Sequence, residues 1–349
     1  MAARRAAPVP SLIVLTERQE LILRRVVETH QATAQPVGSK TLAADPAIDF
    51  GPSTIRNELA VLEEQGLLAH PHTSAGRIPT DAGRRFYVDR LLPQGQRAEL
   101  ELPIVKSEVD QAMRVTSATL AQATNLLAIV SAPPLEAATV RHVEVLTLQP
   151  HVAMVVVITS TGSVAKRLIS FEQPIDSGLI TWAAEYLNER LSGYELGART
   201  VVARLREASL GASEQGFLEA LLPVFDDLRS DSEVMLYVEG AGRLLGGDRL
   251  DNLSEINELL SALERRVALL GVLRLALGER DVVVRIGSEN ELPALQSLAL
   301  VGAGYGPRAQ KLGTVSVIGP LQMDYGAVIA TVREAAWQLS RYIEDVDAA

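Results

Sequence analysis

The stretch from Pro36 to Leu92 constrains the fold of this chain more than any other part of its sequence. Its centre reads GPSTIRNELAVLEEQGLL, from Gly51 to Leu68. A proline is favoured at the first position of a helix, and a glycine is common just past the last turn. The sequence therefore predicts a helix that begins at Pro52 and ends at about Gln65, before Gly66.

The two faces of this predicted helix carry different side chains. Successive residues are about 100° apart around a helix, so Ile55, Leu59 and Leu62 share one face that can be buried. The opposite face carries small or hydrogen-bonding side chains, flanked by a cation and a valine: Ser53, Arg56, Asn57, Ala60 and Val61. Small residues allow close approach to DNA, and amide or guanidinium groups bond base edges in the major groove. A solvated surface helix would look the same, so the helix alone leaves both interpretations open.

The residues that follow favour the DNA-binding interpretation. Leu67 to Ala69 can form a short strand, Pro71 to Gly76 is a polar turn, and Arg77 to Pro79 can return as a second strand. Thr80 to Leu92 then predicts a closing helix. Helix, hairpin and helix in this order are typical of a winged helix-turn-helix domain. A wing tip rich in hydroxyl groups suits contact with phosphates or the minor groove.

Two earlier helices complete this predicted domain. The first runs from about Glu17 to about Thr33, where Thr16 and Gln19 form a capping box. The second is short, with Ser39 as its expected N-cap and Leu42 facing inward.

The predicted DNA contacts come from three places in this stretch. On the third helix they are Ser53, Thr54, Arg56 and Asn57; on the wing they are His72, Thr73, Ser74 and Arg77; on the second helix they are Lys40 and Thr41. The third helix is expected to contact bases or phosphates, and the second helix to hold the DNA backbone.

Charge is uneven along the chain, which has a formal net charge of −10. Residues 1–92 hold 11 Lys or Arg and 10 Asp or Glu, whereas the remainder holds 22 and 33. A nearly neutral head on an acidic body suits a DNA-binding protein that keeps its body away from phosphates. Ordinary scatter of charge would give the same numbers.

Composition narrows the other possibilities. The chain has no cysteine, which excludes disulfides and thiolate chemistry and fits a cytoplasmic location. Its longest strongly apolar run, Val152 to Ile158, is far too short to span a membrane. Pro8 and Pro10 interrupt the apolar N-terminus, so we expect a flexible leader rather than a signal peptide.

No group of residues predicts catalysis, a cofactor or a metal site. Ser163 and Lys166 have the spacing of a serine/lysine pair, but they fall on a predicted strand rather than at a helix start. His70 and His72 lack a carboxylate at ligand spacing. We therefore expect a protein that is not an enzyme.

Beyond a predicted hinge at Leu92 to Leu102, the remaining pattern alternates between helices and strands. Helices are expected at 105–130, 178–191, 211–230, 254–277 and 324–343, and strands at 142–148, 152–159, 164–171, 233–239, 281–286, 298–302 and 314–318. Strands, a helical interruption and further strands indicate one α/β domain with another inserted in it.

Several motifs resemble the family of heat-inducible transcription repressors called HrcA. They are LTERQELILRRVVETH, PVGSKTL, STIRNELAVLEEQGLL, PHTSAGRIPT and VIGPLQMDYGAVI. The resemblance implies an α+β multidomain fold, in which a GAF-like α/β domain is interrupted by an inserted dimerisation domain. We expect the winged helix-turn-helix at 11–92, the two GAF-like parts at 93–172 and 278–349, and the insertion at 173–277.

The same resemblance implies a function. It describes a homodimer that represses heat-shock chaperone operons by binding an inverted repeat in double-stranded DNA, with activity promoted by the GroE chaperonin. Gln322 stands where the family usually has arginine, so any role of that arginine does not transfer. The alternative is a winged-helix regulator controlled by a small-molecule ligand in the GAF-like domain. An open polar pocket within residues 141–319 would favour that alternative.

Overall fold

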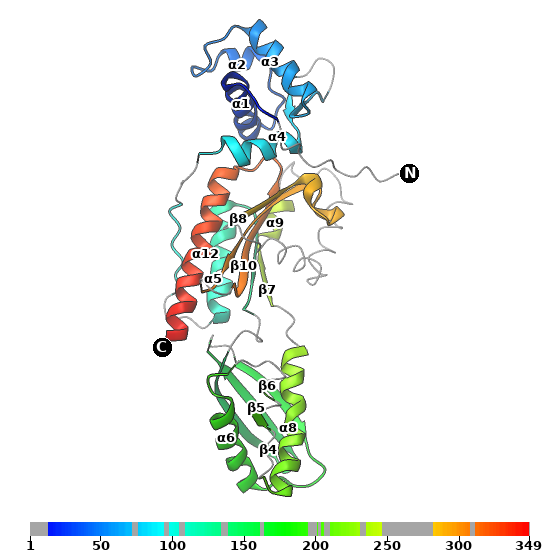
Figure 1. The fold of residues 1–349 in the computed structure, drawn as a ribbon, viewed down its shortest axis with the longest axis vertical. Coiled ribbons are helices and arrows are strands. Elements are labelled where there is room, and N and C mark those ends of the chain that lie inside the picture. Colours follow the sequence, from blue (N-terminus) through cyan, green and yellow to red (C-terminus); the bar gives the residue numbers. More distant parts are fainter. Residues whose placement is uncertain are drawn as a thin grey trace, which may run out of the picture.

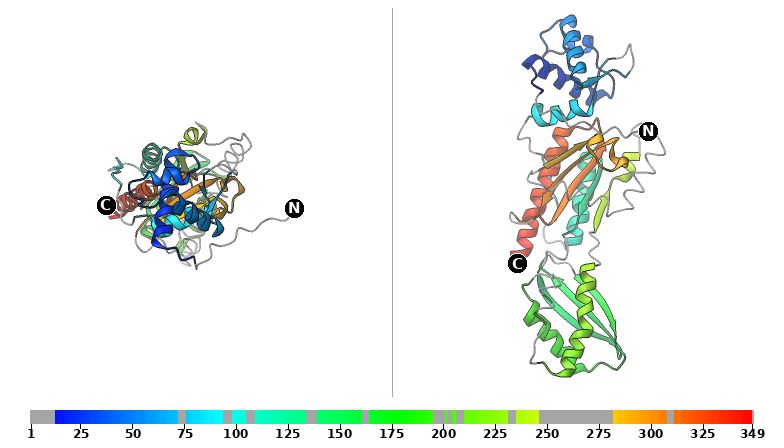
Figure 2. Two further views of the ribbon diagram at one scale, coloured as in Figure 1. Left: turned by 90° about the horizontal axis from the view of Figure 1, so that it is seen from above. Right: turned by 45° about the vertical axis from the view of Figure 1, so that its right-hand side comes forward.

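Three units are stacked along the long axis of the molecule (Figures 1 and 2). We call them the head (residues 13–92), the body (a five-stranded sheet with its helices) and the lower unit (a three-stranded sheet with its helices). The computed structural model describes residues 13–71, 76–93, 98–104, 109–133, 139–160, 164–194, 201, 204–205, 210–230, 235–245, 282–307 and 311–348.

The head is built from short helices and one small hairpin. Its elements are α1 (Glu17–Thr33), α2 (Ser39–Ala43), α3 (Pro52–Glu64), β1 (Leu68–Ala69), β2 (Ile78–Pro79), α4 (Asp81–Phe86) and the π-helix η1 (Tyr87–Leu91). The predicted extents of α1 and α3 are confirmed within one residue, and so is the capping box of Thr16 and Gln19. The predicted cap Ser39 is wrong by one position, because Gly38 is the N-cap and Ser39 is already helical.

The body contains one antiparallel sheet that is covered on both faces. Its strands are β3 (Leu127–Ser131), β7 (Leu236–Glu239), β8 (Val282–Ile286), β9 (Leu298–Tyr305) and β10 (Gly313–Pro320), in the order β7-β3-β10-β9-β8. Alternate residues of β3 face opposite sides, as strand geometry requires. Ala128 and Val130 face α5 (Val109–Thr124) and α12 (Tyr325–Ala348), whereas Leu127 and Ile129 face a smaller cluster on the other side.

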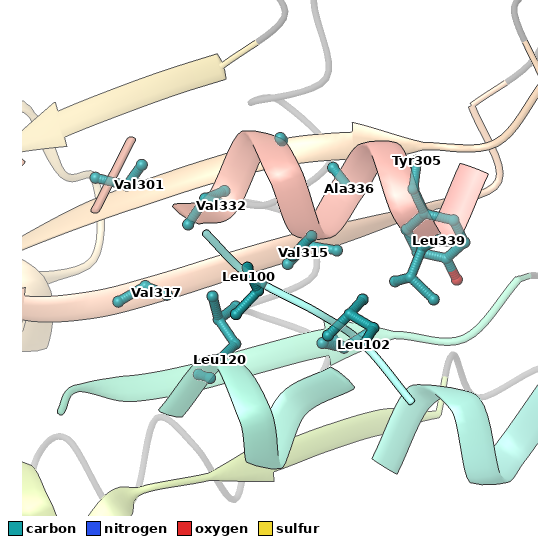
Figure 3. Packing of buried hydrophobic residues seen from close by; sticks show 14 of the residues in the cluster. Leu100, Leu102, Leu120, Val301, Tyr305, Val315, Val317, Val332, Ala336 and Leu339 are labelled. Carbon is teal, nitrogen blue, oxygen red and sulfur yellow. The ribbon is translucent and has the colours of Figure 1, made fainter. Parts of the chain in front are cut away.

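The larger core lies between the sheet and the helices α5 and α12 (Figure 3). The extended segment 98–104 also joins it, although Leu92 to Leu102 was predicted as a hinge. Leu100 and Leu102 are buried there, and Gln338 of α12 accepts a hydrogen bond from the amide of Leu102 at 2.8 Å. At its described C-terminal end, this predicted hinge is therefore docked on the body.

The predicted helix Val105 to Val130 is wrong in its second half. The α5 helix ends at Thr124, Asn125 takes a left-handed φ of 54°, and β3 follows at Leu127. Every residue of β3 is buried. A short run that is apolar on all sides has no period, so it cannot be assigned to a helix or a strand from pattern alone.

The lower unit does not follow the expected boundaries. The strands β4 (Val140–Gln149), β5 (Val152–Thr159) and β6 (Val164–Ser170) form their own antiparallel sheet. They share a core with α6 (Ser177–Leu191) and α8 (Ala212–Ser230), separate from the core of the body. The pattern placed these strands in the first GAF-like part, before an insertion at 173. The three strands were correctly predicted, but their sequence does not indicate which sheet they join.

The predicted helix at 254–277 lies outside the described residues. Among the helices that the structure describes, none is long and apolar enough to cross a membrane.

Gly83 provides a test of the packing inside the head. The carbonyl oxygen of Leu67 accepts hydrogen bonds from the amide and hydroxyl of Thr80, and a Cβ at Gly83 would overlap that same oxygen. We expect Gly83→Ala to destabilise the head by about 1–3 kcal/mol, the usual scale of overpacking. The measurement is the midpoint of thermal unfolding. Gly216→Ala is the matched control, because Gly216 is also helical but has open space around it, so no decrease is expected there.

Candidate nucleic-acid interface

The α3 helix presents the polar face that its sequence predicts. Ile55, Leu59 and Leu62 are buried in the core of the head. Ser53, Arg56 and Asn57 are exposed and Thr54 is half-buried. Within the part of the chain that the structure describes, Arg56 makes no ion pair. Its guanidinium group is therefore available to a phosphate or a base edge.

A buried carboxylate fixes the position of α3. Glu58 lies on the inner face of the helix, where its side chain is 11% exposed. It pairs with the guanidinium of Arg18 at 2.7 Å and accepts a hydrogen bond from the amide of Gln19 at 3.0 Å. The prediction missed this residue, although its place three residues after Ile55 and four before Leu62 puts it on the apolar face. Because both partners lie in the first turn of α1, the pair sets how α3 crosses α1.

The short α2 helix lies between α1 and α3. Its Leu42 is buried in the head core, whereas Lys40 and Thr41 are exposed. The predicted contacts on α2 and α3 are therefore accessible to solvent.

The base of the hairpin is held by backbone pairing with the segment before α2. Val37 and Arg77 exchange two hydrogen bonds of 2.8 Å, and a Cβ at Gly76 would lie 2.5 Å from the carbonyl of Val37. Only glycine allows this close approach of the two backbones. His72, Thr73 and Ser74, predicted at the tip, lie outside the described residues.

Arg77 is engaged inside the head rather than free. Its guanidinium pairs with Glu63 of α3 at 2.7 Å and also contacts His70. His70 lies 3.0 Å from the same carboxylate. The hydrogen bond from His70, assisted by the charge of Arg77, lowers the pKa of Glu63 below its ordinary value. This cluster ties the end of α3 to the residues that directly follow β1 and directly precede β2.

The described residues contain no group of three or more His, Cys, Asp or Glu side chains arranged to hold a metal ion.

These features define a mixed α/β protein of several units with a small helical head. Similarity to known proteins then identifies the family. Residues 110–329 match the model described as the HrcA protein C-terminal domain. The chain belongs to the family of heat-inducible transcription repressors called HrcA.

The relatives are similar over nearly their whole length. The heat-inducible transcription repressor HrcA of Parafrankia sp. (strain EAN1pec) is 36% identical over 93% of this chain and 97% of that protein. The same repressor of Acetivibrio thermocellus is 31% identical over 95% of this chain and 97% of its own. A crystal structure described as that of a hypothetical protein has a TM-score of 0.67 at 23% identity, covering 95% of this chain and all of that one. That structure supports the fold alone.

Substitution of Glu58 tests whether its carboxylate stabilises the head. We expect Glu58→Gln to destabilise the head by about 1–2 kcal/mol, because the ion pair is lost while Arg18 stays half-exposed. Glu64→Gln is the matched control on the exposed face of the same helix, and it should leave the unfolding midpoint within about 0.5 kcal/mol of the parent. Equal effects of the two variants on thermal unfolding would contradict the anchoring role.

Proposed function

We propose that this protein is a sequence-specific transcription repressor of heat-shock chaperone operons, whose head is a winged helix-turn-helix. The observation that carries this proposal is the exposed face of α3. Ser53, Arg56 and Asn57 lie on that face, and the opposite face of the helix is apolar and buried. Family membership supports the same function, because the relatives carry the name heat-inducible transcription repressor.

In this proposal the first two turns of α3 enter the major groove. Arg56 and Asn57 read base edges or neighbouring phosphates, while Ser53 and Thr54 bond the backbone. Lys40 and Thr41 hold the backbone from α2. Because Arg77 pairs with Glu63, Arg77 positions the wing in this proposal. His72, Thr73 and Ser74 make the DNA contacts of the wing.

We assign the homodimer contact to the open face of the lower sheet. One face of β4–β5–β6 is covered by α6 and α8, but the other has no cover among the described residues. On this face, Leu146, Met154 and Leu168 lie side by side in one row across the three strands. Ile158 of β5 pairs with Val164 of β6. Leu146, Val164 and Leu168 are exposed, the last by 66%. A contiguous apolar patch of this kind is a common mark of a protein–protein interface.

Charge on the same face supports a second copy of this chain as the occupant. Glu144 on the β4 edge and Lys166 on the β6 edge flank Val156 in one row across the sheet. A two-fold axis parallel to the strands would place β4 of one protomer over β6 of its partner. Each Glu144 would then face a Lys166, and each Leu146 would face a Leu168. A face that complements itself suits an isologous dimer, and a two-fold dimer suits an inverted repeat.

The role of the GroE chaperonin is supported by the family resemblance alone. In that proposal the chaperonin promotes the active repressor, and heat diverts chaperonin to unfolded proteins so that repression falls.

A ligand-controlled regulator is not favoured. Between the five-stranded sheet and the helices α5 and α12, the described residues form an apolar core. Tyr305, which is fully buried there, donates its hydroxyl proton to the carbonyl of Ser131 at 2.6 Å. A cleft of about 500 Å³ is found instead beside the head, bounded by the end of α1, the end of α5 and the start of α12.

Arg56→Ala tests the assignment of α3. We expect operator affinity to fall by about 1–3 kcal/mol, or roughly 5- to 150-fold, the scale of one good base contact. The measurement is a gel-shift titration at fixed salt, with thermal unfolding unchanged. Arg90→Ala removes an exposed arginine outside the proposed interface and is the matched control. Unchanged affinity of Arg56→Ala would remove this residue from the interface.

Leu168→Asp tests the dimer contact. A carboxylate forced into an apolar interface lacks a partner, so we expect the dimer dissociation constant to rise by at least about 30-fold. Sedimentation equilibrium measures it. Val14→Asp, at an exposed apolar position in the head, should remain as dimeric as the parent. A dimeric Leu168→Asp variant would contradict the assignment.

The function itself is tested by footprinting on the chaperonin promoter of the source organism, with and without chaperonin. Protection of an inverted repeat is expected. No protection at low salt, where phosphate contacts are strongest, would overturn the proposed function.

A further inference from the structure

The contact between head and body combines apolar packing with polar contacts. In the described residues, Val88 and Leu92 are the side chains that pack against both the head core and the body core. Among the described residues, hydrogen bonds and ion pairs add to this packing. One of them is at the end of α1, where the amide of Gln31 donates to the carbonyl of Met323 at 3.0 Å. The others join α4 to the loop that follows β8.

Arg85 is the centre of this second contact. Its Nε donates to Oε1 of Glu289 at 2.8 Å, and another guanidinium nitrogen donates to the second oxygen of the same carboxylate. The same nitrogen donates to the carbonyl of Val284 in the middle of the edge strand β8. A two-point arginine–carboxylate pair fixes orientation as well as distance. Burial alone would lower the pKa of Arg85, but the hydrogen bonds and charge of Glu289 raise it.

Asp81, one turn earlier in α4, makes a parallel contact. Its carboxylate accepts hydrogen bonds from the amide and the hydroxyl of Ser288, at 3.0 and 2.9 Å. Gly287 has a left-handed φ of 54°, and a Cβ there would overlap the carboxylate of Asp81. The loop can therefore come this close only because it has glycine at this position.

On the body side of the contact, neighbouring residues hold Glu289 in place. Glu289 accepts a hydrogen bond from the amide of Ile286 at 2.8 Å, and its carbonyl accepts one from Arg285 at 3.2 Å. The carboxylate is thus held in place for Arg85. Asp81, Arg85, Gly287, Ser288 and Glu289 together form a contact that we call the head–body latch.

We propose that the latch sets the spacing between half-sites that the dimer accepts, with Arg85 and Glu289 as its positioning residues. This inference rests on the proposed function. If the two bodies are joined through their lower units, each head reaches DNA only from the end of its own body. Two recognition helices must then lie about one helical turn of DNA apart, or a multiple of it. A fixed head selects one spacing, whereas a loose head accepts several.

The first experiment needs no DNA. Because the chain lacks cysteine, Glu64→Cys on the head and Arg333→Cys on the body give two specific spin-label positions, both exposed. Labelled chains are diluted with unlabelled ones so that distances are measured within one protomer by pulsed electron resonance. We expect a narrow distance distribution in the parent and a broad one with Arg85→Ala, Glu289→Gln or Gly287→Ala. The control Arg90→Ala, five residues beyond the latch arginine, should stay narrow. A narrow distribution in all the variants would overturn the latch.

The second experiment measures spacing selectivity. Affinities are measured for one half-site and for inverted repeats whose spacer changes by single base pairs. For Arg85→Ala and Glu289→Gln we expect unchanged half-site affinity, about a tenfold loss at the best spacer, and a flatter dependence on spacer length. A parental spacer dependence in these variants would overturn the inference while leaving the proposed function intact. If the parent bound neither half-site nor repeat at low salt, the proposed function itself would fail, and the distance measurement would still decide on the latch.

Discussion

The pairing of β3 with both β7 and β10 is the constraint on which the rest of the structure depends. These strands come from three distant parts of the chain, yet they lie side by side in one antiparallel sheet. The chain between β3 and β7 must therefore leave the sheet and return to the strand next to its starting point. That excursion contains β4, β5 and β6, which form a second core with α6 and α8. The separate lower unit follows from this topology.

Local sequence signals predicted the head well, and they predicted the body less well. The helices α1 and α3 carry their own caps, apolar faces and terminators, so each helix is specified by neighbouring residues. β3 has no such signal, because it is buried on both faces and its partners lie far away in sequence. The exposed residues of α3 could be predicted from helical periodicity. The pairing of Arg85 with Glu289 could not, since nothing near either residue in sequence indicates the other.

The three units have unequal contacts with one another, and this determines which parts of the molecule can move. The body has an apolar core that includes the extended segment around Leu100 and Leu102. The head has its own apolar core. Between them, Val88 and Leu92 pack against both cores. The junction also contains hydrogen bonds and ion pairs, and water can replace each of these at a cost of about 1 kcal/mol or a few. A change in head orientation breaks these contacts but leaves both apolar cores intact, so it costs less free energy than unfolding either unit.

Much of the charge of the head is paired within the head itself. Several of its carboxylates are already paired internally: Glu58 with Arg18, Glu63 with Arg77, Asp45 with Arg25 and Asp89 with Arg85. Among the described residues, Lys40 and Arg56 have no such partner. Glu63 would repel phosphates at the end of α3 if it stood alone, but Arg77 and His70 offset its charge. The counts of acidic and basic residues are therefore a poor guide to phosphate binding, because what a phosphate meets is the set of charges that remains unpaired at the surface.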